Sequence, residues 1–178
     1  MYVYIHVMRT SALNAVLKDL AKRGRWSVSE STLRTFLPEP VNTFRVAMAR
    51  HVRTNAITRV APGLYLNPFA PPPAWALERL AAHLRPNDAY YLSLEAALHE
   101  HGLISQAPNR LTVLTSGRSY TYSTSLGVIE FVHTARAPAV WRPRTTFSPE
   151  RGIHVASPDL ALDDLRRVGR NLDLVETE

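Results

Sequence analysis

The spacing of apolar residues at the start of the chain predicts an amphipathic helix. Five apolar residues recur at intervals of three and four positions, as on one face of a helix: Leu13, Val16, Leu17, Leu20 and Ala21. Thr10 or Ser11 is expected to cap the start of this helix, and Gly24 to end it. The alternation of apolar and polar residues over 1–8 predicts a short strand before it.

A serine–glutamate pair and two prolines bound a second predicted helix. Ser27 and Glu30 have the spacing of a capping box, in which each side chain accepts a hydrogen bond from the other residue's backbone N–H. The apolar stripe of this helix consists of Leu33, Phe36 and Leu37. Pro38 and Pro40 then end the helix, because proline lacks the backbone N–H that would continue the hydrogen bonding.

A third helix is predicted over about residues 42–54, with two unlike faces. One face carries Phe44, Met48, His51 and Val52. The other face carries Asn42, Arg45, Val46, Ala49, Arg50 and Arg53. Two short β-type runs follow on either side of Pro62 and Gly63, which is typical of a hairpin. This order of helices and hairpin predicts an N-terminal winged helix-turn-helix domain over residues 1–66.

Prolines separate this domain from the rest of the chain. Four of the seven residues 67–73 are proline, which indicates a stiff linker before a second domain over residues 74–178. There we expect helices over 75–84 and after the capping residues Ser93 and Ser157. Strands are expected over 89–92, 111–115, 127–134 and 153–155, and a loop over 138–149. Because strands and helices do not alternate regularly, the sequence predicts a C-terminal mixed α/β domain and an α+β fold class.

The basic residues are concentrated in the first domain. Residues 1–72 contain ten Lys and Arg against three Asp and Glu, a net charge of +7, whereas residues 73–178 have a net charge of −1. A localised positive charge favours binding to a polyanion, because neutralised phosphates release counterions. A basic surface that only keeps the protein in solution is the alternative explanation.

The third helix is the candidate for DNA contact. A recognition helix needs long hydrogen-bonding side chains and small residues that let its backbone approach the groove. No acidic residue occurs between Glu39 and Glu78, whereas a solvated helix face would mix Glu with Lys. Phosphate contacts by Arg59 in the hairpin and by Arg34 in the second helix would add to this surface. The predicted DNA-binding residues are Arg34, Asn42, Thr43, Arg45, Ala49, Arg50, Arg53 and Arg59.

Neither cysteine chemistry nor a membrane segment is indicated. The chain has no cysteine, which removes disulfides, thiol nucleophiles and zinc ribbons. The apolar residues 1–8 lack a basic leader and a small-residue cleavage site, and they are too few to span a bilayer. We therefore expect a cytoplasmic protein without a membrane partner.

The remaining motifs do not form a catalytic constellation. The side chains of His99 and His101 point in different directions on a helix, so a solvated helix end is favoured over a metal site. Pro158 and Asp159 resemble half of a nuclease motif, but the only lysines of the chain lie far away in the first helix. Asp163 and Asp164 are expected at the surface of the last helix. The sequence therefore predicts a protein that is not an enzyme and has no cofactor or metal.

Three segments carry a family resemblance. They are residues 59–67 (RVAPGLYLN), 91–103 (YLSLEAALHEHGL) and 153–165 (IHVASPDLALDDL). In this order and at these spacings the chain resembles the AbiEi-type antitoxins of type IV toxin–antitoxin systems over most of residues 13–165. The C-terminal half is short for that family. The predicted strand over residues 1–8 is not expected from it.

The resemblance implies a transcriptional autorepressor that binds repeats in its own promoter. Such a protein also neutralises a nucleotidyltransferase-type toxin encoded beside it, without a stable complex with that toxin. The helix-turn-helix residues of the family correspond to Arg45, Arg50 and Arg53 here. Two alternatives stay open: a winged-helix repressor whose second domain senses a ligand or dimerises, and a nucleic-acid-processing enzyme.

Overall fold

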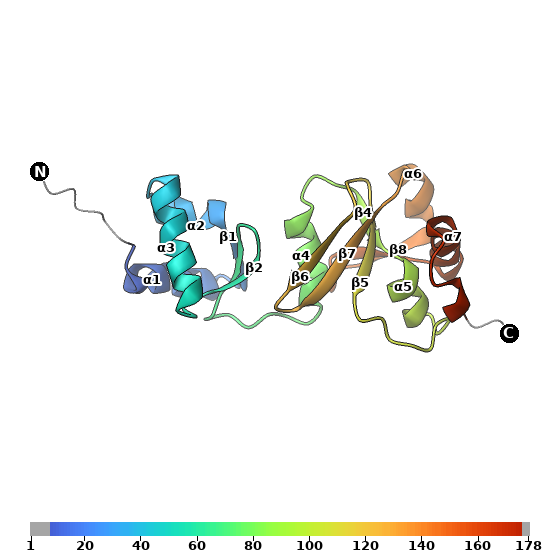
Figure 1. Ribbon diagram of the computed structural model, residues 1–178, viewed down its shortest axis with the longest axis horizontal. Coiled ribbons are helices and arrows are strands. Elements are labelled where there is room, and N and C mark those ends of the chain that lie inside the picture. Colours follow the sequence, from blue (N-terminus) through green and yellow to red (C-terminus); the bar gives the residue numbers. More distant parts are fainter. Residues whose placement is uncertain (1–7, 176–178) are drawn as a thin grey trace, which may run out of the picture. The chain divides into compact units, whose positions relative to one another are not determined.

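The chain folds into two compact units that together have an α+β architecture. The structure is a computed structural model, and it describes residues 8–175. The first unit ends at Pro73 and the second begins at Ala74 (Figure 1). The strand predicted over residues 1–8 lies outside the described residues, except for Met8. Among the described helices, none combines the length and the apolar character needed to cross a membrane.

Unit 1 consists of three helices and a small antiparallel sheet. Its elements are α1 (Thr10–Lys22), β1 (Ser27–Ser29), α2 (Glu30–Phe36), α3 (Val41–Arg53), β2 (Thr58–Ala61) and β3 (Leu64–Leu66). The strand order is β1-β3-β2, so β3 pairs with both other strands. Pro62 and Gly63 form the turn of the β2–β3 hairpin, and Gly63 has a φ of +71°, which favours glycine.

One apolar core holds unit 1 together. It is formed by Met8, Leu13, Leu17, Leu20, Val28, Leu33, Phe44, Ala47, Met48, Ile57 and Tyr65. Phe44 is fully buried in it, and its truncation to alanine would cost about 3–5 kcal/mol. The buried Asn67 closes the unit, because its side-chain amide donates to the carbonyl oxygens of Leu17 and Arg25. The first residue of the predicted linker is therefore part of the fold.

The N-terminal caps predicted for α1 and α2 are wrong, whereas Gly24 follows the end of α1 as predicted, with a φ of +72°. Thr10 is already the first residue of α1, and the cap residue Arg9 makes no side-chain capping bond. The capping residue of α2 is Ser29, whose hydroxyl accepts from the backbone N–H of Thr32, and not Ser27. The start of α2 is displaced because residues 27–29 form the additional strand β1. Pairing of Ser27 with β3 holds the backbone extended where the sequence predicted a helix.

Unit 2 is built around one mixed sheet. Its elements are α4 (Ala76–Leu84), β4 (Tyr90–Leu92), α5 (Leu94–Glu100), β5 (Leu111–Thr115), β6 (Tyr120–Thr124), β7 (Gly127–His133), α6 (Pro138–Trp141), η1 (Arg142–Arg144), β8 (Thr145–Ser148), β9 (Ile153–Ala156), α7 (Pro158–Val168) and η2 (Leu172–Leu174). The strand order is β6-β7-β5-β4-β9-β8, in which β4–β9 and β5–β7 are parallel pairs. Helices α5 and α7 pack together beside the sheet, and α4 packs against β7 (Figure 1).

The structure corrects two elements predicted for unit 2. The segment 138–149, predicted as a loop, contains α6, η1 and the edge strand β8, which pairs with β9. Ser93 precedes α5 as expected, but its side chain makes no capping bond. Instead the Thr112 hydroxyl of β5 accepts from the N–H of Ala96 and donates to the Ser93 carbonyl oxygen. By contrast, the predicted cap at Ser157 is confirmed, since its hydroxyl accepts from the N–H of Leu160.

Candidate nucleic-acid interface

Helix α3 buries one face in unit 1 and exposes the other. The buried face consists of Phe44, Ala47, Met48 and His51. On the outer face Asn42, Arg45, Val46, Ala49 and Arg53 are exposed, and Thr43 and Arg50 are half-buried. The helix contains three arginines and no acidic residue, and it begins where Pro40 ends the preceding connection. The two faces predicted from the sequence are therefore those of the folded helix.

Arg45 and Arg53 extend from the outer face with free donors. Nε of Arg45 donates to Oε1 of Glu30 at 3.0 Å, and the Arg45 side chain is 64% exposed. The terminal nitrogens of Arg45 make no hydrogen bond within residues 8–175. Arg53 is exposed and has no hydrogen bond or ion pair with any described residue. Both guanidinium groups are thus available to a ligand, and Glu30 fixes the orientation of one of them.

Arg50 is partly used by the fold itself. One of its terminal nitrogens donates to the Met8 carbonyl oxygen at 2.6 Å, and Nε2 of the buried His51 lies 3.3 Å from the same oxygen. Burial lowers the pKa of His51 below its usual value, and the neighbouring charge of Arg50 acts in the same direction. The neutral imidazole can therefore donate from Nε2 to Met8. These contacts attach the segment before α1 to the end of α3.

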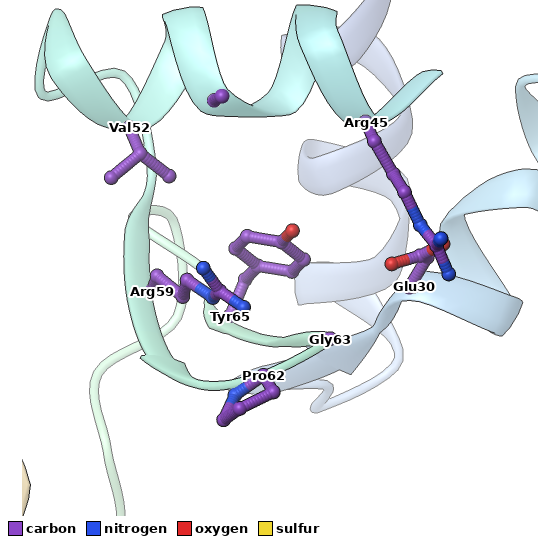
Figure 2. A pocket seen from close by; sticks show the side chains of 8 residues that line it. Glu30, Arg45, Val52, Arg59, Pro62, Gly63 and Tyr65 are labelled. Atoms are coloured by element: carbon purple, nitrogen blue, oxygen red, sulfur yellow. The ribbon is translucent and has the colours of Figure 1, made fainter. Parts of the chain in front are cut away.

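A hollow separates α3 from the β2–β3 hairpin. It has a volume of about 640 Å³ and is lined by Glu30, Arg45, Ala49, Val52, Arg59, Pro62, Gly63 and Tyr65. Figure 2 shows Arg45 and Glu30 at one end, Arg59 on the hairpin and the Tyr65 ring between the hairpin and α3. Burial raises the pKa of Tyr65, so its hydroxyl is neutral over the physiological range. The hollow therefore presents two guanidinium groups, one of which is balanced by a carboxylate.

A second hollow lies along the outer face of α3 itself. It has a volume of about 600 Å³ and is lined by Asn42, Thr43, Val46, Ala47, Ala49, Arg50 and Arg53. Ala49 lines both hollows, so they adjoin on the helix. The small side chain of Ala49 leaves room there for a group that approaches the backbone of α3. Arginines lie on either side of that position.

The fold brings together seven of the eight predicted DNA-binding residues. Asn42, Thr43, Arg45, Ala49, Arg50, Arg53 and Arg59 line one or both hollows. Arg34 lies on α2, is half-buried and lines neither. Glu30 and Tyr65 were not predicted as site residues. No local pattern marks the Glu30–Arg45 pair, because its members are 15 residues apart and meet only in the folded unit.

A buried aspartate lies at the centre of unit 2, and the prediction that Asp164 is a surface residue is wrong. Its side chain is 1% exposed and accepts hydrogen bonds from the hydroxyls of Tyr91 (2.9 Å) and Ser93 (2.8 Å). Nε of Arg136 lies 3.1 Å from the other carboxylate oxygen. Burial raises the pKa of Asp164, while these three partners oppose that shift by favouring the charged form. The cluster joins α7 to β4.

Other acidic side chains of unit 2 are paired with arginines. Arg170 makes bidentate contacts with Glu95 and Glu130 at 2.8–3.0 Å, and these contacts lower the pKa of Glu130. Arg151 bridges two further glutamates, with a bidentate contact to Glu100 and a single contact to Glu78. These networks connect α4, α5, β7 and the C-terminal segment. Their geometry is that of structural ion pairs that compensate partly buried charges.

The histidines of the α5 region lie apart from these networks. His99 Nδ1 contacts the Ile104 carbonyl oxygen at 3.1 Å, and His101 Nε2 contacts that of Ala156 at 2.8 Å. Within residues 8–175 no three His, Cys, Asp or Glu side chains are grouped closely enough to hold a metal ion.

The chain matches no protein-family model and no curated protein.

Proposed function

We propose that unit 1 is a winged helix-turn-helix domain that binds double-stranded DNA. In this proposal α2 and α3 form the helix-turn-helix, α3 lies in the major groove, and the β2–β3 hairpin is the wing. The order of the elements and the three-stranded antiparallel sheet support this assignment. So does the net charge of +7 over residues 1–72, which are ten Lys and Arg against three Asp and Glu.

The single observation that carries the proposal is the outer face of α3. It combines exposed arginines with small side chains and has no carboxylate on the helix. The terminal nitrogens of Arg45 and Arg53 make no hydrogen bond to any residue between 8 and 175, and a bidentate contact to guanine needs two such donors. Asn42 at the start of the helix has the amide that pairs with adenine or contacts phosphate.

Glu30 and the hairpin complete the proposed interface. The Glu30 carboxylate holds Nε of Arg45 and leaves the two terminal nitrogens unbonded among the described residues, and this fixed side chain would lose less entropy on binding a base. Arg59 lines the same hollow from β2, where its Nε donates to the Ala61 carbonyl oxygen, and its terminal nitrogens would contact a backbone phosphate beside the groove. Arg34 lies away from both hollows, and we leave it out of the proposed interface.

The biological role that we propose is that of an antitoxin and transcriptional autorepressor. It rests on the resemblance of residues 59–67, 91–103 and 153–165 to AbiEi-type antitoxins. The protein would bind repeats in its own promoter and neutralise a nucleotidyltransferase-type toxin without a stable complex. We propose no catalytic role for unit 2, because its buried acidic groups are compensated by arginines and hydroxyls.

Affinity for the DNA upstream of the protein's own gene tests the DNA-binding proposal. The full chain should bind this duplex more tightly than a scrambled duplex of equal length, with an affinity that falls steeply with salt. Arg45→Ala should weaken specific binding by roughly 5- to 150-fold, the equivalent of about 1–3 kcal/mol. Arg167→Ala removes an exposed arginine of α7 in unit 2 and is the matched control. Equal binding of both duplexes would reject the proposal.

Co-expression with the neighbouring toxin tests the antitoxin role. Growth should be rescued by the full chain, and unit 2 should be required, since unit 1 already supplies the proposed DNA-binding surface. Expressing the full chain, residues 1–73 and residues 74–178 in parallel separates these contributions. Full rescue by residues 1–73 alone would contradict the assignment of neutralisation to unit 2.

A further inference from the structure

Val46 is the most exposed of the large apolar side chains in the described part of the chain. The residue is 72% exposed, although it lies in the middle of a 13-residue helix. A β-branched residue at such a position is less favourable for the helix than alanine by about 0.5 kcal/mol, and it exposes two methyl groups to water. Since Val46 adds nothing to the core of unit 1, its place on α3 points to a partner outside the unit.

The surroundings of Val46 narrow the chemistry of that partner. Asn42, Ala49, Arg50 and Arg53 lie one or two turns away on the same side and line the same hollow. The lining of the hollow combines the apolar side chains of Val46 and Ala49 with the guanidinium groups of Arg50 and Arg53. A ligand that fits both features carries negative charge and also presents a small apolar group between its charged parts.

The major groove of DNA has this combination. Phosphates border the groove, and the only apolar group that the four natural base pairs present there is the 5-methyl group of thymine. We propose that Val46, together with Ala49, contacts a thymine methyl group and makes thymine the preferred base at one position of the bound site. The proposal rests on the DNA-binding function proposed above and adds a specificity-determining residue to it.

Replacing thymidine by deoxyuridine in the bound duplex tests this directly, because uracil lacks only the methyl group. The full chain should lose about fourfold in affinity when the contacted thymidine is replaced, the equivalent of about 0.8 kcal/mol for one buried methyl group. Val46→Ala should bind the thymidine duplex about as weakly as the wild type binds the deoxyuridine duplex. This variant should also no longer distinguish the two duplexes.

An exposed valine of unit 2 serves as the matched control. Val140→Ala, at a valine of unit 2 that is 53% exposed, should keep the wild-type preference for thymidine. If the wild type binds its own upstream DNA specifically but binds both duplexes equally at every replaced position, the Val46 inference fails and the DNA-binding proposal stands. If it binds no duplex specifically, both fail. A change in oligomeric state on Val46→Ala, with the thymidine preference unchanged, would assign Val46 to contacts between copies and overturn the inference.

Discussion

Two arginines of α3 should respond differently to the same substitution. The half-buried Arg50 donates to the Met8 carbonyl oxygen at 2.6 Å, whereas Arg53 makes no hydrogen bond or ion pair with any residue in the described part of the chain. A hydrogen bond with a charged donor contributes about 1.5–3 kcal/mol. Because His51 still contacts the Met8 oxygen in Arg50→Ala, we expect a loss of about 1–2 kcal/mol. Arg53→Ala exchanges two good helix formers at an exposed position and should cost about 0.5 kcal/mol or less.

Thermal unfolding and DNA binding together distinguish the two residues. A loss of 1 kcal/mol lowers the Tm of a domain of this size by roughly 4–8 °C, so Arg50→Ala should melt visibly earlier and Arg53→Ala should not. In DNA binding we expect the larger effect from Arg53→Ala. Arg53→Ala should relax the preference at one base pair by about 1–3 kcal/mol if it contacts guanine, or lower the salt slope by about one if it contacts phosphate.

Two results would refute this reasoning. If Arg50→Ala melts like the wild type, the contact with Met8 does not stabilise unit 1. If Arg50→Ala and Arg53→Ala both bind the upstream DNA like the wild type at every salt concentration, α3 is not the helix that contacts DNA. Arg50→Lys, which keeps a charged donor, is the matched control for the stability loss.

Three further predictions concern pH, ion pairing and the division into units. The folded state lowers the pKa of His51, so the stability that the neutral imidazole contributes is complete above the unfolded pKa of about 6.5 and is lost as the pH falls below it. The difference in Tm between pH 7.5 and pH 5.5 should therefore be smaller for His51→Gln than for the wild type. Arg170→Met removes the guanidinium that Glu95 and Glu130 share and should destabilise unit 2 by about 2–4 kcal/mol in urea unfolding. Because Arg170 lowers the pKa of Glu130, the loss should be smaller at low pH, where Glu130 is protonated in both states. The fragment ending at Pro73 should fold and retain the DNA affinity in a gel shift, while residues 74–178 should not bind; comparable affinity of both fragments would contradict the division.

Much of the architecture followed from local patterns in the sequence. The two faces of α3 follow from residue spacing along a helix, and the hairpin follows from Pro62 and Gly63, whose backbone preferences match its turn. The cap at Ser157 has the same origin, because the groups involved are three residues apart. The change from a basic to a nearly neutral composition coincides with the boundary at Pro73. In each case the interacting groups are near neighbours in the chain.

Other features depended on contacts between residues distant in the sequence. Strand β1 forms only because β3, nearly 40 residues later, pairs with it, and that pairing moves the cap of α2 from Ser27 to Ser29. Asp164 has the local pattern of a surface residue. In the folded unit it is buried, because the hydroxyls of Tyr91 in β4 and of Ser93 directly after β4 donate hydrogen bonds to its carboxylate. The Glu30–Arg45 contact is also long-range. Local periodicity fixes which face of a helix or strand is apolar. Only the packed fold decides which polar groups of that element are buried, because a buried charge requires partners that distant segments supply.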